Sequence, residues 1–436
     1  MPSAQSRRRV LVLADQAASS LSNVLVAVLV ARSFPDETEP FAAFSLAVMV
    51  FQFTVGSVRG LIFEPELLLH GERSRHEARR ILPSYLSATG LVGVAVSVAV
   101  AGTSVVVGGL AGAALLALSL VLPFILVQDA WRYVFITVHP GKALTIDLVW
   151  VATSCTAIVL VPNATAIGWY VVAWGAGGLL GAIVATVIGE VEWGRVRPVR
   201  YLVAHRSLGV RFLGEFATAQ TGYFGALLSC GWILGLNAYG AVRGGFLYIG
   251  PLQMLAAGVL MATLPEARKA RDDPDRVLRL VRGGNALVCL ATVVWVSVGL
   301  VLPESVGEAL IGATWNEARE VLVPLGITMI GMSIVSAALV GVRAFDGTQG
   351  LRTRLQSIPF QLLCPIAGAY LGGLDGFVIG MALGQAVGAG IWWTTFRRLL
   401  AGAHRSTARH LAGDGREPRP APPDVAAFVL ADDAPY

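Results

Sequence analysis

The stretches LADQAASSLSN (residues 13–23) and LGEFATAQTGY (residues 213–223) decide how this chain is organised. Each begins an apolar segment and places an acidic residue, Asp15 or Glu215, near its start. The segments that follow also end alike, in LIFEPE (residues 61–66) and ATLPEA (residues 262–267). Both pairs recur at a spacing of about 200 residues, as in a duplicated bundle. The sequence therefore predicts two halves of the same design.

The composition is that of a membrane protein. The chain has 436 residues, of which 55% are hydrophobic and 14% charged, and its mean hydropathy is +0.67. A soluble protein could not bury so much apolar surface. Apolar stretches of about 20 residues match the thickness of the hydrocarbon core. The apolar stretches predict twelve spans, each boundary being good to about four residues: 10–32, 41–63, 81–105, 110–132, 143–161, 166–189, 212–236, 243–264, 283–302, 320–343, 355–372 and 376–396.

These spans predict an all-α polytopic membrane protein with about 12 transmembrane helices in two six-helix, pseudo-symmetric bundles. We expect an N-terminal bundle over residues 1–205 and a C-terminal bundle over residues 206–400. The basic loop that begins at Glu190 separates them. Residues 401–436 are polar and rich in Pro and Arg, which predicts a disordered cytoplasmic tail.

The basic residues gather in alternate loops. The arginines of one side are Arg7 to Arg9, Arg73 to Arg80, Arg195 to Arg211, Arg268 to Arg282, Arg352, Arg354, Arg397 and Arg398. The intervening loop SFPDETEP (residues 33–40) is acidic. By the positive-inside rule, this pattern places both termini in the cytoplasm. The net charge of +5 is thus explained without a nucleic-acid partner.

Enzyme motifs are missing from the sequence. It contains no GxxxxGK[ST], HExxH or GxSxG motif, and its four cysteines stand singly inside apolar spans. We therefore expect no catalytic residue, no metal and no cofactor. Without an ATP site, the energy for any transport would come from an ion gradient, the membrane potential or the gradient of the substrate itself.

Polar residues line one side of the first span. Gln16, Ser20 and Asn23 stand at positions i, i+4 and i+7, and Gln220 with Glu215 repeats the pattern in the seventh span. Such a side cannot face lipid without cost, so it should face the interior of the bundle. Hydrogen bonding between helices and lining of a substrate path both remain open. Repeated halves that enclose polar residues are typical of secondary transporters.

A charged cluster is predicted at the inner end of the first half. Its members are Arg59, Glu64, Asp129, Arg132 and Asp147. Buried charges need partners, so we expect these residues to pair with one another, either as a static cluster or as a cytoplasmic gate. Arg343 in GVRAFDG stands where Arg132 stands in DAWRYVF.

Arg32 and Arg243 lie toward the outer side of the predicted spans. Guanidinium groups bind phosphate oxygens in bidentate fashion, so arginines that face a cavity would suit an anionic cargo. Snorkelling to the membrane interface is the alternative for each of them.

Two further patterns concern packing. The glycines of the sixth and twelfth spans recur every four residues, which indicates close helix contact or sliding of one helix on another: Gly177, Gly181, Gly376, Gly380, Gly384 and Gly388. The loop at residues 303–320 has apolar residues at helical spacing and predicts a short interfacial helix anchored by Trp315.

Several stretches together resemble the multidrug/oligosaccharidyl-lipid/polysaccharide (MOP) exporter superfamily, in particular the polysaccharide or O-antigen type flippases of the bacterial inner membrane. They are DQAASSLSNVLVAVLVARSF, VRGLIFEPELL, QDAWRYVF, YGAVRGGFLYIGPLQML and EALIGATWNEAREVLVPLG. The resemblance implies MATE-like bundles around a central cavity and alternating access that carries a lipid-linked saccharide from the inner to the outer leaflet. The chain lacks the two additional spans of the lipid II flippases, so lipid II is a less expected cargo.

The resemblance also implies roles for individual residues. Arg32, Arg59, Arg132, Arg243 and Arg343 become candidates for binding the diphosphate of the cargo or guarding the cavity. Asp15 and Glu215 become candidates for ion coupling or gating, beside Glu64, Asp129 and Asp147 in the inner cluster. The expected partners are the lipid-linked saccharide, membrane lipid, a coupling ion (Na⁺ or H⁺) and a glycan polymerase or glycosyltransferase.

Other functions remain open at this stage. A MATE-like multidrug or cation antiporter could use Asp15, although many arginines would repel a cationic cargo. A non-transporting scaffold of a glycan assembly complex would have no need for charges at membrane depth. An integral glycosyltransferase would need catalytic acids or a large outer loop.

Overall fold

The computed structural model describes residues 22–34, 37–66, 75–162, 166–189, 191, 196–312, 314–346 and 349–411. This part of the chain is helical and contains no strand. A short helix, Ser22–Arg32, comes first. The elements that follow are α2 (Glu39–Val58), η1 (Arg59–Phe63), α4 (Arg75–Val107), α5 (Gly109–Val138), α6 (Pro140–Leu160), α7 (Ile167–Ile188), α8 (Pro198–Lys269), α9 (Pro274–Val301), α10 (Glu304–Ile311), α11 (Thr314–Glu320), α12 (Leu322–Phe345) and α13 (Gln349–Leu411).

Two of these helices are hairpins rather than single rods. α8 breaks at Gly235 (φ 87°, ψ 175°), and α13 breaks at Gly372 and Gly373, the latter with φ 59°. Positive φ values are inexpensive only for glycine, so these residues set the turning points. With each arm counted, helices lie at eleven of the twelve predicted spans, and Ser22–Arg32 is the described part of the first.

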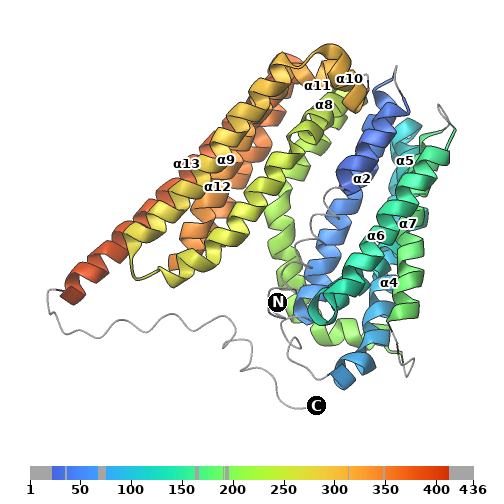
Figure 1. Cartoon of the computed structure of the whole chain (residues 1–436), viewed down its shortest axis with the longest axis horizontal. Coiled ribbons are helices and arrows are strands. Elements are labelled where there is room, and N and C mark those ends of the chain that lie inside the picture. Colours follow the sequence, from blue (N-terminus) through green and yellow to red (C-terminus); the bar gives the residue numbers. More distant parts are fainter. Residues whose placement is uncertain are drawn as a thin grey trace, which may run out of the picture.

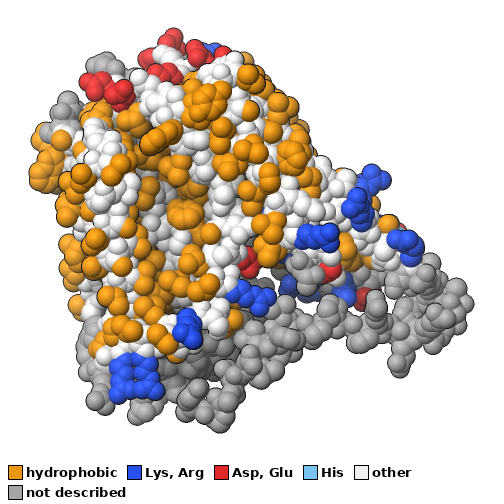
Figure 2. All heavy atoms as spheres, turned by 180° about the vertical axis from the view of Figure 1, so that it is seen from behind, with side chains coloured by type: hydrophobic (Ala, Val, Ile, Leu, Met, Phe, Trp, Pro, Cys, Tyr) orange, Lys and Arg blue, Asp and Glu red, His pale blue; other side chains and the backbone are white. Residues whose placement is uncertain are grey.

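The helices form two bundles that meet at one end (Figure 1). α2, α4, α5, α6 and α7 belong to the first bundle, and α9, α12 and α13 to the second, with α8 leading from one to the other. The bundles converge where α10 and α11 lie and separate toward the opposite end. In the space-filling view, apolar side chains cover the flanks of the molecule (Figure 2). Acidic groups gather at the end where the bundles converge, and arginines and lysines gather at the opposite end.

Glycines allow the close contacts inside the second bundle. The two arms of α13 touch through Gly368 and Gly376, where an added Cβ atom would lie about 2.0 Å from the opposite backbone. Cβ atoms at Gly380 and Gly384 would meet the backbone of Cys364 and Phe360 at 2.3 and 2.4 Å. In the first bundle, Gly177 and Gly181 likewise lie against α5 and α6. The predicted role of these glycines in close packing is confirmed.

The structure confirms part of the prediction for the loop at residues 303–320. It forms two short helices, α10 and α11, at the closed end. Trp315, however, is 0% exposed and is no interfacial anchor. Gly307 has no Cβ atom and leaves room for the indole ring, which also contacts the ring of Tyr248 edge-on at 5.5 Å. The tryptophan therefore fixes the loop from inside.

The end of α13 differs from the sequence expectation. The helix continues to Leu411, so residues 401–411 are helical rather than part of a tail. The remainder of the predicted tail, residues 412–436, lies outside the described residues.

Candidate functional site

A buried ion pair joins the end of the second span to α5. Arg59 opens η1, a turn of π-helix of the kind that is frequent at functional sites. Its guanidinium donates from Nε to Asp129 Oδ2 at 2.8 Å and from Nη2 to Asp129 Oδ1 at 2.6 Å. This two-pronged geometry is the strong form of an arginine–carboxylate contact. The guanidinium also lies 5.7 Å from the ring centre of Tyr133.

A second ion pair joins α5 to α6 near the first. Arg132 Nε lies 2.8 Å from Asp147 Oδ2, and these side chains are only 7% and 5% exposed. Gln128 Nε2 donates to the other oxygen of Asp147 at 3.1 Å. Each buried charge therefore has an opposite charge at contact distance, as burial requires. The two pairs together carry no net charge.

Four of the five residues predicted for this cluster thus lie together. Glu64 is the exception, because it is exposed and forms no ion pair with any described residue. It follows η1 by one position, at an exposed place on the helix. The expectation of mutual pairing therefore holds for Arg59, Asp129, Arg132 and Asp147, and a gating role for the cluster stays a prediction.

A cavity of about 770 Å³ lies between the bundles and is lined by both of them. The first bundle contributes residues of the helix Ser22–Arg32 and of α2, and the second contributes residues of α8, α12 and α13. A side chamber of about 300 Å³ holds the two ion pairs. Asn23, Gln52 and Phe216 line both spaces, so the chamber adjoins the cavity.

Two arginines of the second half line the main cavity. Arg243 on α8 donates from Nη1 to the hydroxyl of Tyr223 at 3.4 Å, and its buried Nε has no hydrogen-bond partner among the described residues. Arg354 on α13 donates from Nη1 to the carbonyl of Ala219 at 3.1 Å and lies 5.8 Å from the ring of Trp392. Neither guanidinium pairs with a carboxylate in the described part of the chain. Their positive charge is therefore available to a ligand.

The remaining wall of the cavity is neutral and mixed. Gln361 Nε2 donates to Gln385 Oε1 at 3.1 Å, and further glutamines line the same space. Between them lie aromatic rings, such as Phe246, and the thioethers of α12, such as Met329. Such a wall can hydrogen-bond a polar group and cover an apolar one.

Other predicted site residues have different positions. Asn23 and Gln220 line the cavity, as a substrate path would require. Arg32, Arg343 and Glu215 are exposed and line neither space. Asp15, Gln16 and Ser20 lie outside the described residues. The roles assigned to all of these residues stay predictions.

Some cavity residues were missed by the sequence analysis. Arg354 was counted among the loop arginines, because the eleventh span was expected to begin at residue 355, whereas α13 begins at Gln349. Gln52, Gln253 and Gln385 each interrupt an apolar stretch, and this was a signal in the sequence. A polar amide inside a span needs a partner or a cavity.

The cavity is closed at the end that bears α10 and α11. There the hydroxyl of Thr38 donates to Asn237 Oδ1 at 2.9 Å, linking the two halves. A Cβ atom at Gly240 would lie 3.1 Å from Ala42 Cβ, and one at Gly312 would lie 2.8 Å from the carbonyl of Ala31. Because the bundles separate toward the opposite end, the cavity faces the end where the basic residues gather (Figures 1 and 2).

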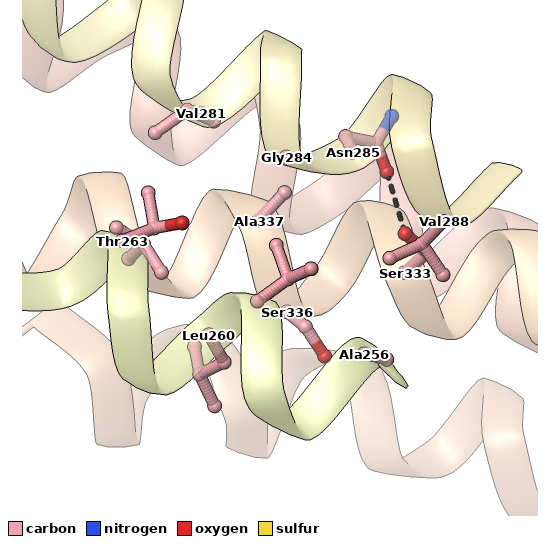
Figure 3. A pocket seen from close by; sticks show the side chains of 12 residues that line it. Ala256, Leu260, Thr263, Val281, Gly284, Asn285, Val288, Ser333, Ser336 and Ala337 are labelled. Carbon is pink, nitrogen blue, oxygen red and sulfur yellow. Dashed lines mark hydrogen bonds between the residues drawn. The ribbon is translucent and has the colours of Figure 1, made fainter. Parts of the chain in front are cut away.

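A third, much smaller space lies inside the second bundle (Figure 3). It measures about 20 Å³ and lies among α8, α9 and α12. Ser333 donates to Asn285 Oδ1 at 2.9 Å at its edge, and Thr263 and Ser336 add hydroxyl groups. The volume suits a single water molecule.

Comparison with known proteins identifies the fold. No protein-family model matches the chain, and no curated protein matches its sequence. Solved structures do match. The lipid II flippase MurJ in an inward closed conformation has a TM-score of 0.69 at 13% identity over 94% of each chain. A multidrug resistance MATE family transporter of the MOP superfamily, inward-facing, has a TM-score of 0.67 at 14% identity over 90% of this chain and 99% of that one.

A MOP superfamily transporter from Pyrococcus furiosus also matches, with a TM-score of 0.57 at 14% identity over 91% of this chain and 95% of that one. This chain therefore has the fold of the MOP superfamily transporters and is a multi-pass membrane protein. The outward-facing form of a MATE transporter is less similar, with a TM-score of 0.58.

Proposed function

We propose that this chain is a flippase that moves a polyprenyl-diphosphate-linked saccharide across the bacterial inner membrane for cell-surface polysaccharide synthesis. The observation that carries the proposal is the pair Arg243 and Arg354, which line the central cavity without a carboxylate partner among the described residues. A diphosphate would supply the missing negative charge. Its oxygens match the fork of a guanidinium, which suits arginine better than lysine.

The rest of the cavity fits the other parts of such a cargo. Its volume of about 770 Å³ lies in the range of ligand sites that enclose a small molecule. Glutamine amides such as Gln361 and Gln385 can hydrogen-bond sugar hydroxyl groups. The prenyl chain need not enter, since it stays in the lipid beside the bundles. The neighbouring fold of a lipid II flippase adds support for a lipid-linked cargo.

The proposed cycle begins with the cavity open to the basic end. The head group enters between the bundles, and the arginines replace its hydration shell. The pairs Arg59–Asp129 and Arg132–Asp147 then rearrange and close the inner side, while the contact of Thr38 with Asn237 opens. Arg32 and Arg343 would guide the head group at the two entrances. No step requires bond making or breaking, so the protein would act as a transporter and not as an enzyme.

The cellular setting follows from the charge pattern. The basic end would face the cytoplasm, with both termini on that side. An ion, Na⁺ or H⁺, bound near Asp15 or Glu215, or the membrane potential, would reset the cycle. A glycosyltransferase would supply the cargo and a glycan polymerase would use it.

A MATE-like multidrug antiporter is the second candidate function. The likeness to MATE transporters and the aromatic and thioether groups in the cavity favour it. The two unpaired arginines argue against it, because they would repel an organic cation.

A leaflet assay in proteoliposomes tests the proposal. It follows a fluorescent polyprenyl-diphosphate saccharide for the wild type, Arg243→Gln, Arg354→Gln and the matched control Arg268→Gln, which is exposed at the basic end. We expect protein-dependent movement that falls at least about tenfold in the two cavity variants and not in the control. Gradient-driven uptake of an organic cation with no movement of the saccharide would establish the antiporter instead. If neither the saccharide nor the organic cation is transported, a non-transporting scaffold would be favoured.

A further inference from the structure

The first four turns of α8 carry a surface that the transport path does not use. On their outward side, exposed arginines alternate with exposed valines: Arg200, Arg206 and Arg211 with Val199 (62% exposed), Val203 (53%) and Val210 (63%). The stretch from Pro198 to Gly214 contains no acidic residue. We refer to residues 198–211 as the base helix.

The inward side of the base helix is firmly attached to the first bundle. Tyr201 is 7% exposed and donates from its hydroxyl to Glu66 Oε2 at 2.6 Å. The backbone nitrogen of Arg197 donates to Ser84 Oγ at 3.1 Å, which ties the start of the helix to α4. Gly209 lies so close to the carbonyl of Leu61 that an added Cβ atom would be 2.4 Å from it. The valines and arginines are thus held outward across the base of the bundle.

This combination of side chains suits one environment. At the basic end of a membrane-spanning bundle, an exposed helix side meets the boundary between headgroups and acyl chains. Valine side chains gain by entering that boundary, while arginine extends to the phosphate groups. A water-soluble polyanion would need the arginines but would leave the valines in water. Charge complementarity therefore favours anionic lipid.

We propose that the base helix is a binding site for the headgroups of anionic phospholipids in the leaflet at the basic end. Arg200, Arg206 and Arg211 hold the phosphate groups, and Val199, Val203 and Val210 lie at the level of the first acyl carbons. Because clusters of arginine near a membrane surface attract anionic lipid, binding increases with the anionic fraction of the leaflet.

The site has a direct connection to the ion pairs of the cavity. A Cβ atom at Gly60 in η1 would lie 3.2 Å from the backbone of Phe212 and Leu213, immediately after the base helix. Gly60 follows Arg59, which holds Asp129. Lipid that fixes the base helix therefore also fixes η1, and the occupancy of the headgroup site sets how easily the Arg59–Asp129 pair rearranges.

Hydrogen exchange in nanodiscs tests this site without any cargo. The full chain is compared in phosphatidylcholine and in phosphatidylcholine with phosphatidylglycerol, with α10 (Glu304–Ile311), which lies at the opposite end and has no basic residue, as the internal reference. We expect exchange over residues 198–211 to slow at least about threefold in the anionic nanodiscs. The variant Arg200→Gln/Arg206→Gln/Arg211→Gln should lose this difference. Arg268→Gln/Arg271→Gln/Arg276→Gln, an equal loss of charge at the same end, should keep it.

The outcomes separate this site from the proposed flippase function. Equal exchange in both lipids, or an undiminished difference in the base-helix variant, overturns the proposal whatever the cargo is. Protection of the same residues by a short RNA as strong as that by phosphatidylglycerol would reassign the surface to nucleic acid. All six arginines are exposed, so the melting temperatures of both variants should match the wild type. Val199→Ser/Val203→Ser keeps the charge, and we expect it to lose part of the protection as well.

Discussion

Thr38 and Asn237 face each other across the closed end of the cavity, joined by a hydrogen bond of 2.9 Å. They lie 199 residues apart in the chain, nearly the spacing at which the two halves repeat. Each stands where the second span of its half begins, Thr38 before α2 and Asn237 after the break in α8 at Gly235. One turn further on, Ala42 meets Gly240. The closure at the end that bears α10 and α11 is thus made by corresponding positions of the two halves.

Removing this hydrogen bond should favour opening at the end that bears α10 and α11. In Thr38→Val the bond is lost, at a cost of about 1 kcal/mol to the closed state, which corresponds to about a fivefold shift of the equilibrium. Spin labels at Glu39 and Glu304, two exposed positions at that end, would report longer distances in the variant. The native cysteines are replaced beforehand. Thr103→Val removes a hydroxyl that bonds only within its own helix and should change nothing. Equal distance distributions for all three proteins would contradict the prediction.

We expect the contributions of Arg59 and Asp129 to the stability of the protein to depend on each other. In Asp129→Asn the guanidinium keeps its charge in a largely buried place, and we expect a loss of about 1–3 kcal/mol, moderated because Arg59 is one-third exposed. Arg59→Gln/Asp129→Asn should recover part of the loss. Denaturant unfolding of the wild type, Arg59→Gln, Asp129→Asn and the double variant in detergent gives the coupling energy. The exposed pair Lys269–Glu266 is the control, and Glu266→Gln should leave the unfolding midpoint unchanged. Additive losses in the double variant would show that the pair does not act as a unit.

Gly380 and Gly390 provide a matched test of the close contact in α13. A Cβ atom at Gly380 would lie 2.3 Å from the carbonyl of Cys364, whereas one at Gly390 would meet nothing within 4 Å. Gly380→Ala should therefore separate the two arms and lower the melting temperature by several degrees. Gly390→Ala should leave it unchanged or raise it slightly, because alanine favours the helix. Similar melting temperatures for the two variants would refute this account of the glycine spacing.

Glu317 should make the stability of the fold sensitive to pH. Burial, together with the neighbouring carboxylate of Glu320, raises the pKa of Glu317, and the nearby hydroxyl group of Thr38 opposes the shift. A raised pKa means that the folded protein binds the proton more tightly than the unfolded chain does. Its stabilising effect is therefore complete at low pH and is lost as the pH rises through the raised pKa.

Melting temperatures between about pH 4 and pH 7 would measure this effect. The wild type should lose stability with rising pH relative to Glu317→Gln, whose neutral amide needs no proton. Glu304→Gln, an exposed change at the same end, should follow the wild type. Parallel curves for the wild type and Glu317→Gln would show that this carboxyl does not titrate in the range.

The spans and their order could be predicted because apolar length alone determines them. The charged cluster could be predicted in part, since Arg59, Asp129, Arg132 and Asp147 are costly to bury alone and must find one another. Glu64 could not be excluded from the cluster, because only the structure shows that its side chain is exposed. Trp315 was misplaced, since tryptophan suits both an interface and a core, and Gly307 decides between them. The place of Arg354 in the cavity could not be predicted, because it depends on where α13 begins and apolar periodicity does not locate that point.

The unequal charge of the two halves has an electrical consequence. Beside the cavity, the first half holds Arg59 and Arg132 in neutral pairs, whereas Arg243 and Arg354 leave up to two positive charges at the cavity. On the proposed function, an empty carrier would then return inward as a cation, while a carrier loaded with a diphosphate dianion would move outward nearly uncharged. A voltage that is negative inside would favour the empty return by about 2.3 kcal/mol per charge for each 100 mV and leave the loaded step almost unaffected. Imposing such a voltage on proteoliposomes should therefore accelerate turnover, and Arg243→Gln/Arg354→Gln should abolish the acceleration. The membrane voltage would therefore favour export over import, because it drives the return of the unloaded carrier and not the movement of the loaded one.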